Sequence, residues 1–369
     1  MKLLLLWLLP LLAGAQTPFP YQLKGKIAPQ PATAKVYLLY NGRLLDSTRL
    51  HNGAFELRGT SDVPKRVQLV LATDGKTPDL ARPYSFNALS VFLEPGPLLV
   101  TSPGATLYNA TVKGGPAMQD YQRFRKQILL LAERQNPHRP DEVPIISWAQ
   151  NILDRQQFKE LALAFIKANP TSWVSLDLLV QSASYLGPPQ YHEVAPLYQA
   201  LSPALRNSAP GQAYGRLLQS LQVVALGAPA PDFTQPTAEG KPFSLKDLRG
   251  KYVLLDFWSS GCDDCRMGFD VIRSLRQQYQ GRKFEAVGVS LDKNISPKHW
   301  RQSIHEHNLT WLQASDLKGP DGNAAALSYR VTSAPQNFLI DPTGNIVGIN
   351  LYGPYLQAAL AKLLPTSSK

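Results

Sequence analysis

Short alternating runs of apolar and polar residues occupy the first third of the chain and predict β-strands. The runs lie at residues 35–40, 44–48, 54–58, 66–72, 89–94 and 98–101. Asn41-Gly42 and Asn52-Gly53 separate the first three runs, and an Asn-Gly pair in that setting predicts a tight hairpin turn with positive φ angles. We therefore expect residues 20–115 to form an antiparallel β-sandwich-like domain.

Helical spacing replaces this alternation in the middle of the chain. Apolar side chains recur there every three or four residues, at Tyr121, Phe124, Ile128, Leu131, Phe158, Leu161, Phe165 and Ile166. This period predicts amphipathic helices whose apolar stripes pack into a core rather than bind a cofactor. Residues 116–226 are thus expected to form a helical region.

A third pattern begins after a Gly-Ala-Pro-rich break at residues 227–231, where apolar strands alternate with amphipathic helices. Strands are predicted at residues 252–257, 284–291, 337–340 and 346–350. Helices are predicted at residues 265–280, 296–307 and 355–364. Such alternation predicts an α/β domain over residues 227–369, with a partly parallel sheet covered by helices.

The first 15 residues have the features of a signal peptide. Met1-Lys2 carries one positive charge, residues 3–12 are almost wholly apolar, and Ala13-Gly14-Ala15 supplies the small residues of a cleavage site. The apolar stretch is shorter than the roughly 20 residues that span a membrane, and Pro10 interrupts it. We therefore expect export rather than anchoring, and a soluble periplasmic protein after cleavage.

Composition and charge exclude several classes of protein. Of the 369 residues, 44% are hydrophobic and 18% are charged, which excludes a wholly disordered chain and suits two or three domains. The net charge of +11 arises mostly in the first 225 residues, which carry 22 Lys/Arg against 14 Asp/Glu. No dense basic run with interleaved aromatic residues occurs, so we expect solvated basic faces and no nucleic-acid partner.

The only two cysteines, Cys262 and Cys265, lie three positions apart where a predicted strand gives way to a predicted helix. Two cysteines cannot build a disulfide-stapled scaffold or an all-cysteine metal site. A helix N-terminus stabilises a thiolate, and the second sulfur is close enough to resolve a mixed disulfide formed by the first. We expect Cys262 to be the exposed nucleophile and Cys265 the resolving thiol.

Two other interpretations of the cysteine pair stay open. A purely structural disulfide is possible, although so short a loop constrains the unfolded chain little. Half of a zinc site would need two further ligands, and His305 and His307 cannot both point the same way from one helix.

The segment around the cysteines resembles a known family. Asp256-Phe257-Trp258, followed by Cys262-x-x-Cys265, resembles the active-site segment of thioredoxins. Residues 230–233 and 240–251 resemble the start of the TlpA/ResA branch, which are exported bacterial thiol–disulfide reductases. Residues 334–344 are similar to the cis-proline strand and hairpin of that branch. The resemblance covers residues 227–365 and implies a thioredoxin fold, while the β-rich front block resembles an uncharacterised domain of Bacteroidetes proteins.

The resemblance implies roles for three residues in the chemistry. Cys262 would attack substrate disulfides, and Cys265 would release the product. Asp256 would accept the proton of the resolving cysteine, which suits a buried carboxylate whose pKa is raised by desolvation. The alternative for Asp256 is a hydrogen-bonded aspartate at the end of a strand.

The resemblance also implies a surface for the incoming substrate. Pro335 would follow a cis peptide bond, and Ala334 would offer backbone hydrogen bonds to the substrate chain. Trp258 is expected to contact the substrate as well. The alternative for Pro335 is an ordinary trans turn proline, since cis is the minority state of X–Pro bonds.

Four departures from the family pattern bear on the chemistry. Gly261 stands where an aromatic cover is usual, Asp263-Asp264 replaces Gly-Pro or Glu-Pro, Gly268 replaces an active-site Glu, and Asp270 replaces a helix-kinking Pro. Negative charge beside Cys262 disfavours its thiolate, and strong oxidants need a stabilised thiolate. We therefore expect a reductant.

The function expected from these patterns is protein disulfide reduction without a cofactor. Electrons would come from a membrane dithiol donor and pass to oxidised protein thiols, with apocytochrome c as one target that the resemblance implies. One alternative is a peroxiredoxin-like (AhpC/TSA-type) peroxidase. Ser259 fits such a site, but the expected upstream proline is absent. The other alternative is an exported binding protein with a tethered redox module.

Overall fold

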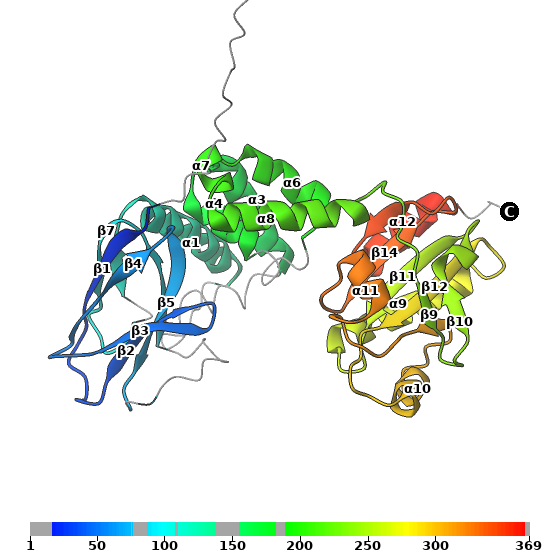
Figure 1. Cartoon of the computed structure of the whole chain (residues 1–369), viewed down its shortest axis with the longest axis horizontal. Coiled ribbons are helices and arrows are strands. Elements are labelled where there is room, and N and C mark those ends of the chain that lie inside the picture. Colours follow the sequence, from blue (N-terminus) through cyan, green and yellow to red (C-terminus); the bar gives the residue numbers. More distant parts are fainter. Residues whose placement is uncertain are drawn as a thin grey trace, which may run out of the picture. The chain divides into compact units, whose positions relative to one another are not determined.

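The computed structural model describes residues 17–74, 76, 87–107, 110–136, 155–181 and 189–365, and the predicted signal peptide lies outside these residues. The chain divides into two compact units (Figure 1). The first comprises Met1–Pro189 with Pro196–Gly215, and the second comprises Gln190–Ala195 with Arg216–Lys369. Among the described residues, no helix is both long enough and apolar enough to cross a membrane.

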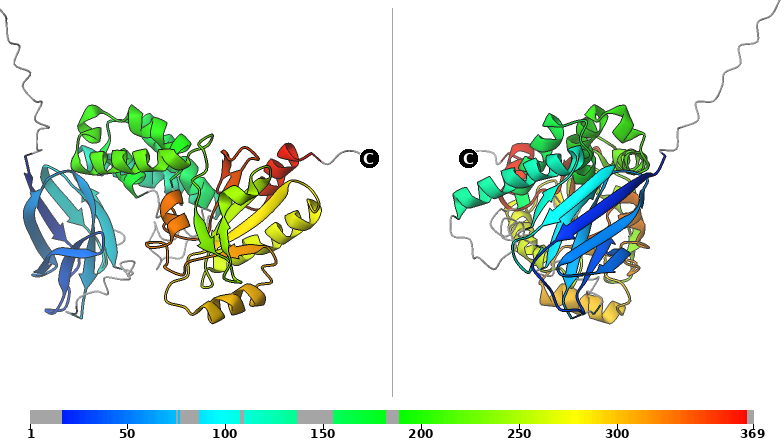
Figure 2. Two further views of the ribbon diagram at one scale, coloured as in Figure 1. Left: turned by 45° about the vertical axis from the view of Figure 1, so that its right-hand side comes forward. Right: turned by 90° about the vertical axis from the view of Figure 1, so that its left-hand side faces the viewer.

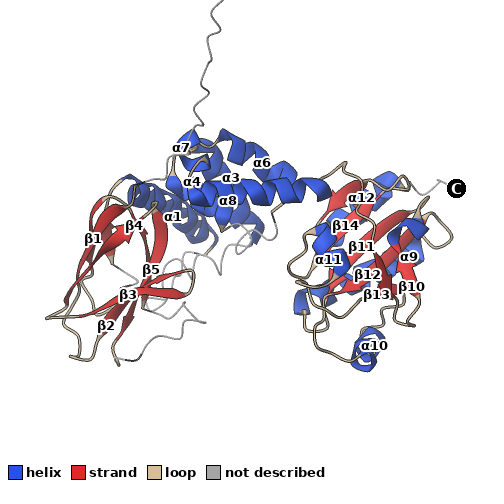
Figure 3. Cartoon of the chain, in the orientation of Figure 1, coloured by secondary structure: helices blue, strands red, loops and turns tan. Residues whose placement is uncertain are grey.

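The first unit begins with strands, drawn red in Figure 3. Its described residues form two four-stranded sheets, of order β4-β1-β7-β8 and β3-β2-β5-β6. The strands are β1 (Phe19–Lys26), β2 (Lys35–Tyr40), β3 (Arg43–Arg49), β4 (Ala54–Ser61), β5 (Lys65–Ala72), β6 (Ala88–Leu93), β7 (Gly96–Thr101) and β8 (Thr111–Lys113). Both Asn-Gly turns have the predicted positive φ angles. This confirms the β-rich front block.

One pairing in these sheets differs from the prediction. β1 pairs with β7 in parallel, whereas every other pair of named strands in the two sheets is antiparallel. The two sheets are therefore mainly antiparallel, as expected, with one parallel pair that the sequence did not indicate. Five strands separate β1 from β7 in the sequence, and hairpin signals predict only neighbouring strands.

Helices follow the strands along the chain, and buried aromatic side chains join these helices to one another. The helices are α1 (Pro116–Gln135), α3 (Arg155–Ala168), α4 (Trp173–Val180), α6 (Tyr191–Ala200), α7 (Pro203–Arg206) and α8 (Ala209–Leu221), with a short 3-10 turn at Gln222–Val224. Phe124 packs edge-on against Phe158 and Phe165, with ring centroids 5.9 and 5.2 Å apart. The apolar stripes thus form a core between α1 and α3, as predicted.

Two carboxylates tie the helices of this unit to its strands. Glu94, at the end of β6, is only 4% exposed and accepts the backbone N–H groups of Ala117 (2.9 Å) and Met118 (3.0 Å) in the first turn of α1. Asp177 of α4 forms an ion pair with Arg66 of β5 at 2.8 Å. The strands and the helices α1 and α4 are therefore packed together in one unit.

The second unit is built on a five-stranded sheet of order β13-β12-β11-β14-β15. Its strands are β11 (Tyr252–Trp258), β12 (Phe284–Ser290), β13 (Leu312–Ala314), β14 (Gln336–Ile340) and β15 (Ile346–Ile349), preceded by the hairpin β9 (Thr234–Pro236) and β10 (Pro242–Ser244). β11, β12 and β13 run parallel, and β14 and β15 are antiparallel additions. The predicted partly parallel sheet is confirmed.

Helices cover both faces of this sheet (Figure 2). They are α9 (Asp263–Gln278), α10 (Pro297–Glu306), α11 (Ala324–Tyr329) and α12 (Gly353–Leu363), with a 3-10 turn at Leu245–Leu248. Leu254 packs with α9 and α12 on one face, while Val253 and Leu255 pack with α11 on the other. β11 is therefore buried on both faces. Its C-terminal end leads through a short loop to the start of α9.

Candidate functional site

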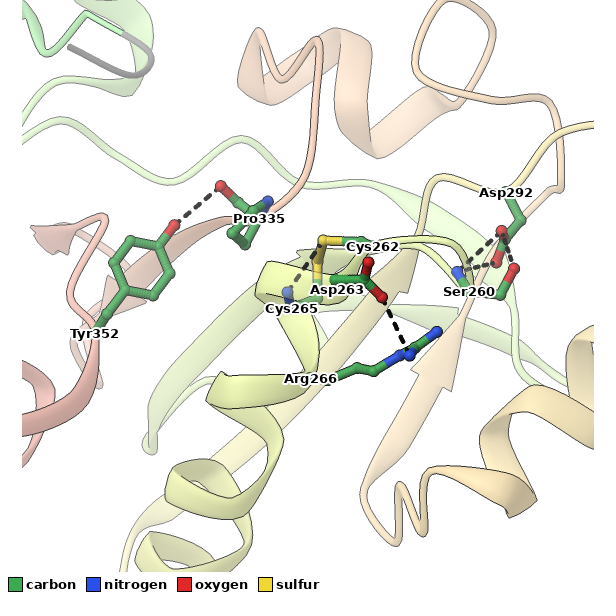
Figure 4. Close-up of a disulfide and its surroundings, with 8 residues drawn as sticks. All are labelled: Ser260, Cys262, Asp263, Cys265, Arg266, Asp292, Pro335 and Tyr352. Carbon is green, nitrogen blue, oxygen red and sulfur yellow. Dashed lines mark hydrogen bonds and ion pairs between the residues drawn. A yellow bond between two sulfur atoms is a disulfide. The ribbon is translucent and has the colours of Figure 1, made fainter. Parts of the chain in front are cut away.

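Cys262 and Cys265 form a disulfide at the start of α9 (Figure 4), with their Cα atoms 5.3 Å apart. Cys262 is the N-cap residue of the helix, and its Sγ accepts the backbone N–H of Cys265 at 3.1 Å. Cys262 is half-buried, whereas Cys265 is only 4% exposed. Cys262 is therefore the sulfur that a second protein can reach.

The loop that carries Cys262 is held from the neighbouring strand. Asp292, just after β12, accepts the backbone N–H of Ser260 at 3.1 Å and its hydroxyl at 2.7 Å (Figure 4). Its other oxygen accepts the hydroxyl of Ser290 at 2.8 Å. Sequence reasoning missed Asp292. The sequence did contain one indication of its role: Asp292 directly follows a strand that runs parallel to β11. The C-terminal ends of parallel strands meet at one edge of the sheet, so Asp292 could be expected near the end of β11.

Replacing Asp292 with alanine should lower the free energy of unfolding by roughly 2 kcal/mol, because hydrogen bonds to a buried carboxylate are lost. Urea unfolding of the oxidised chain, followed by tryptophan fluorescence, measures this change. Asp292→Asn keeps an acceptor for Ser260 and should lose clearly less stability. Equal losses in the two variants would contradict the role assigned to the carboxylate.

Asp256 lies on β11 beneath the disulfide and is only 7% exposed. Burial raises the pKa of this carboxyl to about 7. A cavity of about 20 Å³ has both Asp256 and Cys265 in its wall, which is enough room for about one water molecule. A single water in this cavity can connect the carboxyl group to the buried cysteine.

The Ala334–Pro335 peptide is cis, as the family resemblance implies. Pro335 lines the cavity, and its carbonyl accepts the hydroxyl of Tyr352 at 3.0 Å (Figure 4). Tyr352 also lines the cavity, so its hydrogen bond joins two parts of the cavity wall. Sequence reasoning missed this residue, although it follows β15 at the sheet edge where β11 ends.

Trp258 is the buried last residue of β11, whereas a substrate contact would need an exposed side chain. It is only 1% exposed, its ring N–H donates to Gln313 at 2.9 Å, and it packs edge-on against Phe269 of α9. The expected substrate contact therefore does not fit the structure. The last residue of β11 is still covered by α9, even though the next residues turn into the exposed loop.

The two aspartates between the cysteines have different surroundings. Asp263 forms an ion pair with Arg266 at 3.1 Å and its side chain is 87% exposed (Figure 4). Asp264 is exposed as well, but it lines the cavity together with Asp256 and Cys265. Of the two aspartates between the cysteines, only Asp264 therefore lines the cavity beneath the disulfide.

Two family models match the chain. Residues 226–349 match the AhpC/TSA family, and residues 21–121 match a domain of unknown function, DUF4369. The thioredoxin domain of a thiol-disulfide oxidoreductase from Bacteroides vulgatus is a similar solved structure. It is 33% identical, with a TM-score of 0.35, and the match covers 38% of this chain and 98% of that one.

Curated relatives cover the same part of the chain. The thioredoxin-like protein YneN of Bacillus subtilis is 32% identical over 126 residues, which are 34% of this chain and 71% of YneN. The thiol-disulfide oxidoreductase ResA of Bacillus anthracis is 31% identical over 123 residues, which are 33% of this chain and 67% of ResA. The chain belongs to the ResA-like thiol-disulfide oxidoreductases of the thioredoxin superfamily.

Proposed function

We propose that the chain is an exported reductase that exchanges disulfides with protein substrates through Cys262 and Cys265. The observation that carries the proposal is the disulfide at the start of α9, with one sulfur within reach of another protein and the other covered. Its signal-peptide-like first 15 residues support export to the periplasm.

The reaction proceeds in two exchanges. The Cys262 thiolate, favoured by the N-terminus of α9, attacks a substrate disulfide R–S–S–R′ and expels R′–S⁻. Cys265 then gives its proton to Asp256 through the cavity and attacks the Cys262 sulfur, which expels R–S⁻. The dithiol becomes a disulfide, and the substrate gains two electrons. Because the pKa of Asp256 is about 7, this carboxyl can take up and release protons near neutrality.

The substrate backbone docks at Ala334 and Pro335. Ala334 offers its peptide groups, and Tyr352 holds the Pro335 peptide by donating its hydroxyl to the Pro335 carbonyl. Trp258 takes no part in this contact because it is buried. The docking surface is thus made by the backbone, which accepts many different substrate sequences.

Charge around the disulfide favours the reducing direction. The carboxylates of Asp263 and Asp264 disfavour a thiolate on Cys262, and a destabilised thiolate makes the dithiol the better electron donor. The ion pair with Arg266 offsets part of the charge of Asp263. A membrane dithiol partner would return electrons to the disulfide, and oxidised cysteines of exported proteins, apocytochrome c among them, would receive them.

A trapping experiment tests the proposal. Cys265→Ser leaves Cys262 free to form mixed disulfides that cannot be resolved, so exported proteins should be captured and then released by dithiothreitol. The Cys262→Ser/Cys265→Ser double variant is the control and should capture none. No capture during oxidative challenge, with wild-type expression, would contradict the proposal.

The reduction potential tests the direction. Equilibration of the chain with glutathione should give a value near or below the roughly −270 mV of thioredoxin. A value near the roughly −120 mV of a strong oxidant such as DsbA would contradict a reductase.

The match to the AhpC/TSA family supports thiol peroxidase activity as a second candidate. In that case Cys262 would be oxidised by hydrogen peroxide to a sulfenic acid, Cys265 would condense with it to the disulfide and release water, and an excess of dithiothreitol would reduce the disulfide for the next turnover. Peroxide consumption in excess dithiothreitol that is no faster than with the Cys262→Ser/Cys265→Ser double variant would exclude this candidate and leave the reductase.

A further inference from the structure

The cavity beneath the disulfide joins a buried carboxyl group to an exposed one. β11 contributes Asp256 to its wall, and α9 contributes Asp264, Cys265 and Gly268. Asp256 is 7% exposed, whereas Asp264 lies on the surface. The cavity that Cys265 lines therefore has two carboxyl groups in its wall. Asp256 is closed off from solvent, and Asp264 is accessible to it.

Helix geometry sets Asp264 apart from its neighbour. Residues three or four apart lie on one face of a helix, so Asp264, Gly268 and Val271 share a face, and all three line the cavity. A Cβ atom on Gly268 would meet nothing within 4 Å, so space is open beside Asp264. Asp263 has turned away from this face to pair with Arg266, the residue three positions later.

From this arrangement we infer that Asp264 is the residue through which Asp256 exchanges its proton with solvent. The inference rests on the proposed function. The proton leaves Cys265 for Asp256 as the Cys265 sulfur attacks Cys262, and the expelled R–S⁻ carries away the electron pair of the broken bond. Asp256 then passes the proton across the cavity to the Asp264 carboxylate, which releases it to water. Asp264 influences the reaction only through Asp256, and we therefore call it a positioning residue rather than a catalytic one.

A purely electrostatic role for Asp264 predicts the opposite effect. The titratable and charged groups at the cavity are Asp256 from β11, Asp264 and Cys265 from α9, and Tyr352 ahead of α12. Asp263 and Arg266 lie beside it on α9. If the charge of Asp264 only disfavoured a Cys265 thiolate, its removal would speed the second exchange. If Asp264 transfers the proton, its removal slows that exchange.

A two-phase reaction separates these roles. The reduced full-length chain is mixed with one equivalent of 5,5′-dithiobis(2-nitrobenzoate), and the released thionitrobenzoate is followed between pH 5 and 9. The first release reports attack by Cys262, and the second reports resolution by Cys265. Asp264→Asn should slow the second release about a hundredfold at pH 7, at the lower end of the range of general acid–base effects. The first release should keep or slightly exceed its wild-type rate, because one charge that disfavours the Cys262 thiolate is removed.

Asp263→Asn is the matched control, since it removes the same charge one residue away and should keep the wild-type second release. Asp264→Glu should restore that release. An unchanged or faster second release in Asp264→Asn, or the same slowing in Asp263→Asn, would overturn the inference. If the wild type shows no second release beyond that of Cys265→Ser, the proposed dithiol cycle itself fails. The two failures are therefore distinguishable.

Discussion

Replacing Cys262 with serine is expected to abolish disulfide exchange, slowing the first step by at least about a thousandfold. Cys265 cannot take over, because it is 4% exposed and lies one helical turn beyond the reachable sulfur. Single-turnover reaction of the reduced chain with a peptide disulfide, followed by stopped flow, measures this loss.

Cys265→Ser provides the comparison, since it should keep the first step and lose only the release of product. Should Cys265→Ser lose the first step while Cys262→Ser keeps it, the two cysteines would have the opposite roles.

Asp256→Asn is expected to stabilise the oxidised chain at pH 8 by up to roughly 4 kcal/mol. The folded pKa of Asp256 is raised to about 7 from an ordinary value of 3.8. Between these values the folded chain holds a proton that the unfolded chain has lost, so stability falls as the pH rises through this range. Asparagine carries no charge, and the variant should escape that loss.

Urea unfolding at pH 4 and pH 8 measures the effect. The stability difference between variant and wild type should be small at pH 4, grow up to about pH 7 and then level off. Asp321→Asn, which changes an exposed aspartate, should show no such trend. A difference that does not depend on pH would contradict the assignment of a buried, costly carboxyl group to Asp256.

Features encoded over short stretches of sequence were predictable. The Asn-Gly turns, the apolar run of β11 and the Cys-x-x-Cys spacing are local, and so is the proline before β14. The same holds for helix α9, because Cys262 caps it. The prediction missed β13 and α11, which have three and six residues and are too short for a clear period.

Contacts between distant segments were not predictable in the same way. The Asp292–Ser260 hydrogen bonds and the Tyr352–Pro335 hydrogen bond join residues 32 and 17 positions apart. The burial of Trp258 depends on Phe269 and Gln313, which no pattern around Trp258 reveals. The reactive residues could therefore be recognised in the sequence. The residues that orient them could be recognised only in the folded structure, where the strand ends lie side by side.

Glu94 has a consequence for how the first unit folds. The N–H groups at the start of α1 have no partners within the helix, and Glu94 satisfies those of Ala117 and Met118 from the end of β6. The first turn of α1 thus becomes stable only once β6 has been docked, and Glu94 loses its buried partners if α1 unwinds. The end of β6 and the start of α1 therefore stabilise each other, and we expect them to unfold together.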